Sequence, residues 1–277
     1  SDVYKRQLHD ARPPFAAIGG TVPPEFAVLP TPCYLLDEAA LTRNAEILGG
    51  LAQRTGCRVL LAQKAFSNYD LYPLLAPHLA GTEASGLFEA RLGAEEMPGK
   101  EVHVFCAAYR ADEMDELLRY ADHIVFNSPA QLACFGPKAK AAGKSVGLRI
   151  NPECSTQDGH AIYDPCAPGS RLGTTRAAWD AAVAQDPSLP QLLDGLHFHT
   201  LCEQDSDALE KTLDAEADTC YTDDKDIKTC VKRTSTHNIF WEVHCWVGQL
   251  WMPNMRKYIS TRLLRRVSPK MFYIIRC

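Results

Sequence analysis

Several chemically useful side chains stand at or near the ends of predicted strands, and Lys64 is the first of them. It closes the apolar run that starts at Val59, so its amine is expected at the carboxyl end of a buried strand. Parallel α/β barrels carry their chemistry at that end of the strands. A lysine held there can be partly desolvated and can attack an aldehyde. The alternative is a solvated lysine at a strand end.

Five more polar residues fall at or near strand ends farther along the chain: Glu83, Ser85, Arg149, His197 and His199. A lysine amine, an imidazole and a guanidinium together suit an aldehyde cofactor that carries a phosphate. Each residue also has a structural interpretation. His199 can be a core histidine bonded to a backbone carbonyl, Arg149 can pair with a helix carboxylate, and Glu83 and Ser85 can serve turns and helix caps.

The elements that must position these residues alternate regularly between strand and helix. The apolar patterns predict seven strands, at 33–36, 59–64, 82–85, 102–107, 123–126, 145–150 and 193–199, with helices between them. Such alternation indicates a parallel sheet with helical crossovers. A closed (β/α)8 barrel and an open doubly wound sheet both fit. The chain has neither a GxGxxG nor a GxxxxGK[ST] motif, which favours the TIM-type barrel.

Composition narrows the class of protein further. The chain has 277 residues and a formal net charge of −5, so nucleic acid is not an expected partner. No apolar run reaches the roughly 18–20 residues that a membrane helix needs, and the first residues do not resemble a secretory signal. The eleven cysteines form no CxxC pair, which favours a reducing, cytoplasmic compartment over a disulfide scaffold.

The chain is not uniform, and we predict three regions. Residues 1–30 are expected to form an irregular, proline-rich leader and arm, and residues 31–214 an α/β barrel. Residues 1–214 carry 18 basic against 28 acidic residues, whereas residues 215–277 carry 11 against 6. This contrast predicts a C-terminal tail of foreign sequence, frameshifted or chimeric, that packs poorly against the barrel. The cysteines and histidines of the tail match no standard zinc spacing, so no metal site is expected there.

Five stretches of the chain resemble the fold-type III pyridoxal-phosphate enzymes, the group of alanine racemase and ornithine decarboxylase. They are LLAQKAFS at 60–67, EARLG at 89–93, RINPE at 149–153, DPCAPGSRLG at 164–173 and HFHTLCE at 197–203. Together and in this order they resemble the carboxynorspermidine (carboxyspermidine) decarboxylases over roughly residues 25–214.

The resemblance implies a role for each matching position. Lys64 would form the Schiff base with pyridoxal 5′-phosphate, His199 would stack on the pyridine ring, and Arg149 would lie beneath the cofactor. Cys202 falls where relatives place a small residue near the phosphate, and Glu83 where they have a carboxylate close to the cofactor. The implied reaction is decarboxylation of carboxynorspermidine or carboxyspermidine, a step of polyamine biosynthesis, by a homodimer with shared sites.

Beyond about Leu213 the family pattern is lost. The only glycine after Gly195 is Gly248, so a glycine-rich phosphate loop has no counterpart. The carboxylate that pairs with the pyridine nitrogen and the usual β-domain have none either. We therefore expect an incomplete barrel that is inactive or nearly so. The alternatives are a different fold-type III enzyme, such as diaminopimelate or ornithine decarboxylase or a racemase, and a non-catalytic cofactor-binding fragment.

Overall fold

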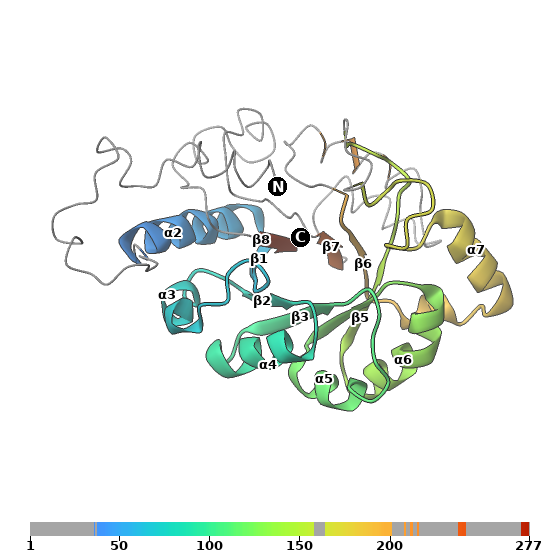
Figure 1. The fold of residues 1–277 in the computed structure, drawn as a ribbon, viewed down its shortest axis with the longest axis horizontal. Helices are drawn as coiled ribbons and strands as arrows, with labels where there is room; N and C mark the ends of the chain where they lie inside the picture. Colours follow the sequence, from blue (N-terminus) through green and yellow to red (C-terminus); the bar gives the residue numbers. More distant parts are fainter. Residues whose placement is uncertain are drawn as a thin grey trace, which may run out of the picture.

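Six parallel strands, each joined to the next by a helical crossover, form the larger part of a barrel in a computed structural model of the chain (Figure 1). The structure describes residue 36, residues 38–157 and 164–200, residues 208, 211, 212 and 215, and the backbone of 238–241 and 273–276. The parallel strands are β1 (Arg58–Ala62), β2 (Gly81–Ala84), β3 (Glu101–Phe105), β4 (His123–Phe126), β5 (Ser145–Arg149) and β6 (Gly195–Phe198).

Helices cover the outer face of this curved sheet, as Figure 1 shows. They are α2 (Glu38–Thr55), α3 (Tyr72–Leu75) with the preceding 3-10 turn η3 (Tyr69–Leu71), α4 (Leu87–Glu96), α5 (Met114–Tyr120), α6 (Pro129–Ala141), α7 (Arg176–Gln185) and the 3-10 turn η5 (Leu189–Leu192). Two begin with a capping hydroxyl: Ser128 accepts from the Gln131 N–H before α6, and Thr175 accepts from the Ala178 N–H before α7.

The strands have an apolar outer face and a polar inner face. Outward residues such as Val59, Leu61, Ile124 and Leu148 belong to hydrophobic clusters with the helices. The alternate positions face the barrel axis, and most of them are polar or small: Gly81, Glu83, Glu101, His103, His123, Gly147, Arg149, Gly195 and His197. Because side chains alternate along a strand, the helix-facing core forces these residues into the interior.

The predicted elements from 59 onward are confirmed. Each of the six strands predicted between 59 and 199 is present, within a few residues of its expected bounds. The first predicted strand, 33–36, lies outside the described residues except for Leu36, which has no regular secondary structure. The leader at 1–30 also lies outside them, and the boundaries 31–214 and 215–277 stay predictions.

Two segments of the C-terminal region correct one expectation. β7 (Asn238–Trp241) pairs in parallel with β6, and β8 (Tyr273–Arg276) pairs antiparallel with both β7 and β1, so the ring closes. The expectation that the tail packs poorly against the barrel is therefore wrong for these eight residues. Unpaired strand edges bind backbone amides and carbonyls whatever the side chains are, which explains the pairing. An antiparallel β8 is still no βα unit, so the parallel barrel is incomplete, as predicted.

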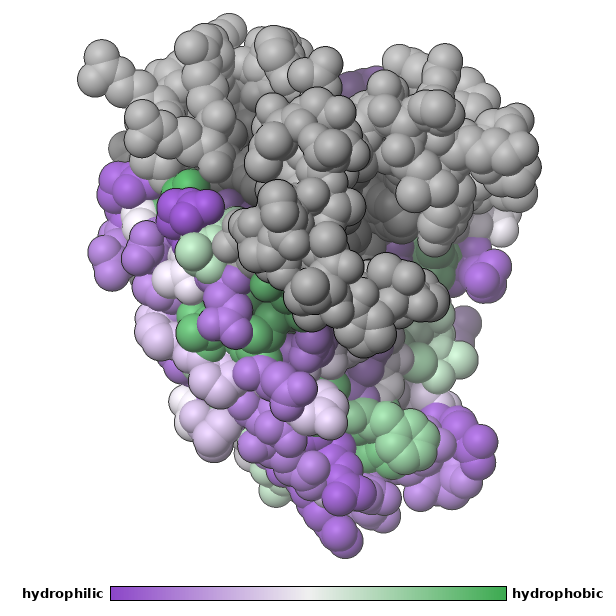
Figure 2. All heavy atoms as spheres, turned by 60° about the vertical axis from the view of Figure 1, so that its left-hand side comes forward, coloured by the Kyte–Doolittle hydropathy of each residue, from purple (hydrophilic) through white to green (hydrophobic). Residues whose placement is uncertain are grey.

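The surface of the described part is mixed in character. On the face shown in Figure 2, hydrophilic side chains are interspersed with smaller apolar areas. Phe88 at the start of α4 is the most exposed large apolar side chain among the described residues, at 80 %. None of the described helices is both long enough and apolar enough to cross a bilayer.

Candidate active site

Lys64 lies just beyond the carboxyl end of β1, in the turn of residues 63–65. Gln63, the residue before Lys64, fixes this turn through hydrogen bonds on the outer side of the sheet. The Gln63 amide donates to the Glu89 carbonyl at 2.7 Å, and its oxygen accepts from the Tyr72 hydroxyl at 3.2 Å. Lys64 therefore follows β1 at the carboxyl edge of the sheet, where the mouth of such a barrel lies. Lys64 is an exposed residue, as in the alternative of a solvated lysine at a strand end.

Glu83 lies inside the barrel, on the strand next to that of Lys64. It is 3 % exposed and pairs in register with Ala62 of β1 and His103 of β3. The sequence offered a turn or capping role as the alternative, but Glu83 is within β2. The capping role at this corner belongs to Glu89, whose carboxylate accepts from the Ser85 backbone N–H at 2.6 Å.

Arg149 is a buried cation at the carboxyl end of β5. It is 4 % exposed, and its Nη2 donates to the backbone carbonyl of His199 at 3.3 Å. Its guanidinium carbon lies 4.8 Å from the centroid of the Phe105 ring. The structure thus brings Arg149 and the backbone of His199 together. His199 follows β6 at the same edge of the sheet as Lys64, and Cys202 lies outside the described residues.

Phe105 and His197 complete this group: the sequence indicated His197 only as a polar residue near a strand end, without a role, and gave no indication of Phe105. Their rings stack with centroids 4.9 Å apart and an angle of 24° between the planes. His197 is the register partner of Arg149, so both contact Phe105 from neighbouring strands. The signal that could have found Phe105 is its position: it is the third inward residue of the segment Glu101-x-His103-x-Phe105.

The loop before α7, which contains the motif DPCAPGSRLG, is held at the carboxyl edge of the barrel in part by the side-chain amide of Asn127. Asn127, after β4, accepts from the Gly173 N–H at 2.8 Å and donates to the Arg171 carbonyl at 2.9 Å. Gly173 has φ +80°, and a Cβ there would lie 2.8 Å from the Ile150 carbonyl oxygen, so only glycine fits. The motif therefore shapes the rim of the barrel mouth.

The comparisons with known proteins agree with this architecture. No family model matches the chain. Over 190 residues it is 43% identical to the carboxyaminopropylagmatine decarboxylase of Synechocystis sp., and over 188 residues it is 37% identical to the carboxynorspermidine/carboxyspermidine decarboxylase of Campylobacter jejuni. These matches cover 69% and 68% of the chain but 47% of each relative, so the chain spans about half the length of the curated relatives it matches.

Solved structures give the same result. The carboxynorspermidine decarboxylase of Campylobacter jejuni in complex with norspermidine has a TM-score of 0.59 and 34% identity, covering 69% of this chain and 47% of that one. The diaminopimelate decarboxylase of Helicobacter pylori in complex with L-lysine has a TM-score of 0.64 over 88% of this chain and 62% of that one. At 17% identity it supports the fold alone. The sequence resemblance to the carboxynorspermidine/carboxyspermidine decarboxylases is therefore confirmed over about two thirds of the chain.

Proposed function

From this similarity to the carboxynorspermidine/carboxyspermidine decarboxylases, we propose that the barrel binds pyridoxal 5′-phosphate and serves decarboxylation of a carboxylated polyamine. One observation carries the proposal: the exposed Lys64 and the buried Arg149 lie at the same carboxyl edge of parallel strands. An amine open to an aldehyde and a fixed positive charge are what this cofactor requires of its site.

The residues present fit part of the cofactor. Lys64 is suited to hold the aldehyde carbon, and the imidazole of His199 to lie against the ring. Arg149 is suited to lie beside the ring because Phe105 and the His199 carbonyl orient its planar group. The phosphate has no such partner here, since none of the residues that the structure describes after Gly195 is a glycine. We keep Cys202 as the candidate near the phosphate, on the family resemblance alone.

When bound, the cofactor supplies the electron sink that accepts the bonding pair released as carbon dioxide leaves. The chain's own residues position and shield the reacting groups. Lys64 would supply the amine at the carboxyl edge, and the buried Arg149 keeps a permanent charge in the interior. Glu83, on the strand next to that of Lys64, is the candidate that would hold a proton during the reaction.

Two substrate types are supported by named relatives. Carboxynorspermidine and carboxyspermidine are the first, and the relatives from Campylobacter jejuni and Herminiimonas arsenicoxydans are named for them. Carboxyaminopropylagmatine is the second, because the relative with 43% identity is named for it. The two types differ in the distal group, a primary amine against a guanidinium, so one carboxylate at the distal end of the site would distinguish them by geometry.

Cofactor binding is the first experiment. The full chain, mixed with pyridoxal 5′-phosphate, should develop Schiff-base absorbance near about 420 nm. Borohydride reduction followed by peptide mapping should place the label on Lys64. The Lys64→Ala variant should lose both signals, while Lys144→Ala, at the opposite edge before β5, should keep them. An unchanged band in Lys64→Ala contradicts the site.

Turnover is the second experiment. Carbon dioxide release is measured with carboxynorspermidine, carboxyspermidine and carboxyaminopropylagmatine, and diaminopimelate serves as the control substrate. We expect cofactor binding with little turnover, because the groups for the phosphate and the pyridine nitrogen have no counterpart in this sequence. Release from diaminopimelate alone would support the other fold-type III assignment. A homodimer and a cytoplasmic location complete the proposal, and sedimentation of the purified chain tests the first of these.

A further inference from the structure

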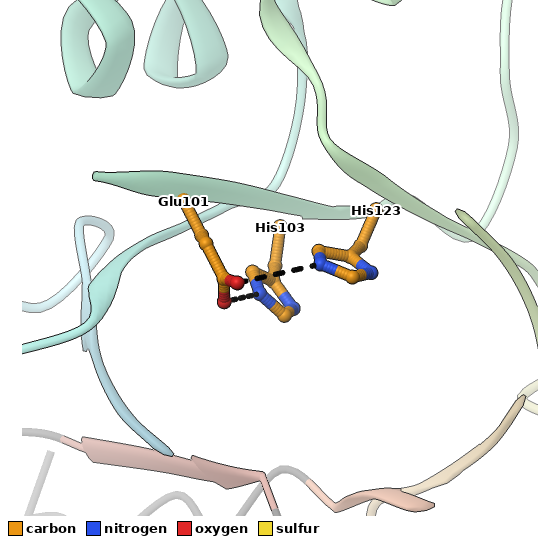
Figure 3. A group of neighbouring side chains, drawn as sticks. All are labelled: Glu101, His103 and His123. Carbon is orange, nitrogen blue, oxygen red and sulfur yellow. Dashed lines mark hydrogen bonds and ion pairs between the residues drawn. The ribbon is translucent and has the colours of Figure 1, made fainter. Parts of the chain in front are cut away.

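Three side chains of metal-binding type meet inside the barrel, at the edge opposite Lys64. Glu101 and His103 lie on β3 and His123 on β4, and Figure 3 shows all three pointing into the ring of strands. His103 Nε2 lies 3.0 Å from one carboxylate oxygen of Glu101, and His123 Nε2 lies 3.9 Å from the other. One potential ligand atom from each residue falls within 4.8 Å of the other two.

The sheet itself holds these ligands in place. His103 and His123 are register partners, so backbone hydrogen bonds of neighbouring strands fix their separation. Their rings stack with centroids 4.1 Å apart and an angle of 26° between the planes. Both are nearly buried, at 5 % and 9 % exposure. A site whose ligands need little reordering binds an ion without a large entropic cost.

The spacing suits a small divalent ion. Nitrogen and oxygen ligands bind Zn²⁺ at about 2.0–2.2 Å, and the tetrahedral angle then sets them roughly 3.3 Å apart. The pair Glu101–His103 is already close to that value, and small side-chain rotations would bring His123 to it. Two imidazoles and one carboxylate are a donor set for Zn²⁺, Co²⁺ or Ni²⁺ rather than for Mg²⁺ or Ca²⁺, which prefer oxygen.

The surroundings support the carboxylate and leave it reachable. Arg58, at the start of β1, forms an ion pair with Glu101. Such an outer partner orients a ligating carboxylate in many metal sites. The side chains of Arg58 and Glu101 are 51 % and 24 % exposed, so the cluster reaches the surface at this edge.

We propose that Glu101, His103 and His123 form a binding site for a divalent transition-metal ion, with Zn²⁺ as the representative ion. The ion joins β3 to β4 at the amino-terminal edge of the barrel, the edge that in such barrels serves stability rather than catalysis. The site is independent of the cofactor proposal, since it shares no ligand with Lys64, Arg149 or His199.

The test is metal binding by the full chain, freed of metal by a chelator. Co²⁺ is titrated while its visible absorption is followed, and Zn²⁺ is titrated by calorimetry and by thermal shift. We expect one ion bound per chain with a spectrum lacking thiolate charge transfer. We also expect His103→Gln and His123→Gln to weaken binding at least about tenfold and to abolish the Zn²⁺-induced rise in melting temperature. His78→Gln, outside the cluster, should leave both unchanged.

Two outcomes overturn the proposal. One is equal affinity in the wild-type chain and in both histidine variants. The other is a cobalt spectrum dominated by thiolate charge transfer, which would assign the ion to cysteines. Glu101→Gln is a further variant that tests the third ligand, because it keeps the shape of the side chain while removing its charge. Circular dichroism of each metal-free variant shows whether it is folded, and affinities are compared among folded variants only.

Discussion

The guanidinium carbon of Arg149, on β5, lies over the ring of Phe105, on β3, at 4.8 Å from the ring centroid. The imidazole of His197 stacks on the same ring. Phe105 is therefore the shared support of a buried cation and an imidazole from two other strands. A cation over an aromatic face is stabilised by about 2 kcal/mol when desolvated, so this ring helps to keep a charge inside the barrel that would otherwise destabilise it.

Replacing that ring is the first prediction. Phe105→Leu should lower the free energy of unfolding by about 2–3 kcal/mol, because both the ring stacking and the cation contact are lost. It should also weaken pyridoxal 5′-phosphate binding, since Arg149 loses its orientation. Urea unfolding and a cofactor titration measure the two effects. The matched control is the exposed Phe88→Leu, with an expected change within about 0.5 kcal/mol. Equal effects of the two substitutions would show that the stacking does not matter.

The contact of α4 with the sheet gives the second prediction. Gly93 packs against β2 so closely that an added Cβ would lie 3.1 Å from Thr82 Cβ and 3.2 Å from the Gln63 amide nitrogen. Gly93→Ala should therefore destabilise the protein by about 1–3 kcal/mol, as overpacking does. Gly50→Ala in α2 is the control, since its Cβ would meet only the flexible end of Arg54. It should stabilise by about 0.5–1 kcal/mol. Thermal unfolding of both variants measures these two changes in stability.

The loop fastened by Asn127 gives the third prediction. Asn127→Ala leaves the Gly173 N–H and the Arg171 carbonyl without their side-chain partner. We expect a loss of about 1–3 kcal/mol and faster proteolytic cutting between 164 and 173. Asn127→Asp keeps the acceptor for Gly173 and removes only the donor, so its cutting rate should be intermediate. Cutting at the wild-type rate in the alanine variant would mean that other contacts hold this loop.

The fourth prediction concerns alkaline pH. Burial raises the pKa of Tyr109 well above its usual value, and its hydroxyl donates to the Val125 carbonyl at 2.8 Å. Since the unfolded phenol ionises at about pH 10, its contribution to stability is complete below that pH and is lost as the pH rises above it. Tyr109→Phe should lower stability at pH 7 by about 1–2 kcal/mol and make its decline above pH 10 shallower.

Urea unfolding at pH 7 and at about pH 10.5 tests this, the second value being chosen just above the ionisation of a free phenol. Some alkaline sensitivity should persist, because burial also raises the pKa of Tyr72. The exposed Tyr69→Phe is the control at pH 7, with an expected change below about 0.5 kcal/mol. A decline just as steep in Tyr109→Phe would assign the alkaline loss to other groups.

The strands and helices between 59 and 199 could be predicted because each carries its own pattern. Val59 and Leu61 face α2 and α3, and Lys64 follows the same strand at its carboxyl end. The exposure of Lys64 could not be read from the sequence, since it depends on what covers the mouth. The closure by β8 was also not predictable, because pairing with β1 follows from a free backbone edge and not from side chains.

The cluster of Glu101, His103 and His123 was missed for a related reason. Glu101 and His103 are two residues apart on one strand, which is no standard ligand spacing in a sequence. His123 joins them only through the register of β3 with β4. Such proximity follows from the pairing of strands joined by a helix. The carboxyl ends of parallel strands, by contrast, gather at one edge by topology alone, so Glu83, Arg149 and His199 could be predicted as neighbours from the sequence.

The two-sided strands have a consequence for redesign. The hydrophobic core is formed by helix-facing residues such as Leu61 and Ile124, while the side chains of Glu83, Arg149 and His197 lie in the barrel interior. A combinatorial library confined to axial positions should therefore yield many variants that melt as one unit yet differ in what they bind. The same diversity placed on the helix-facing side would be eliminated by misfolding before any ligand could be screened.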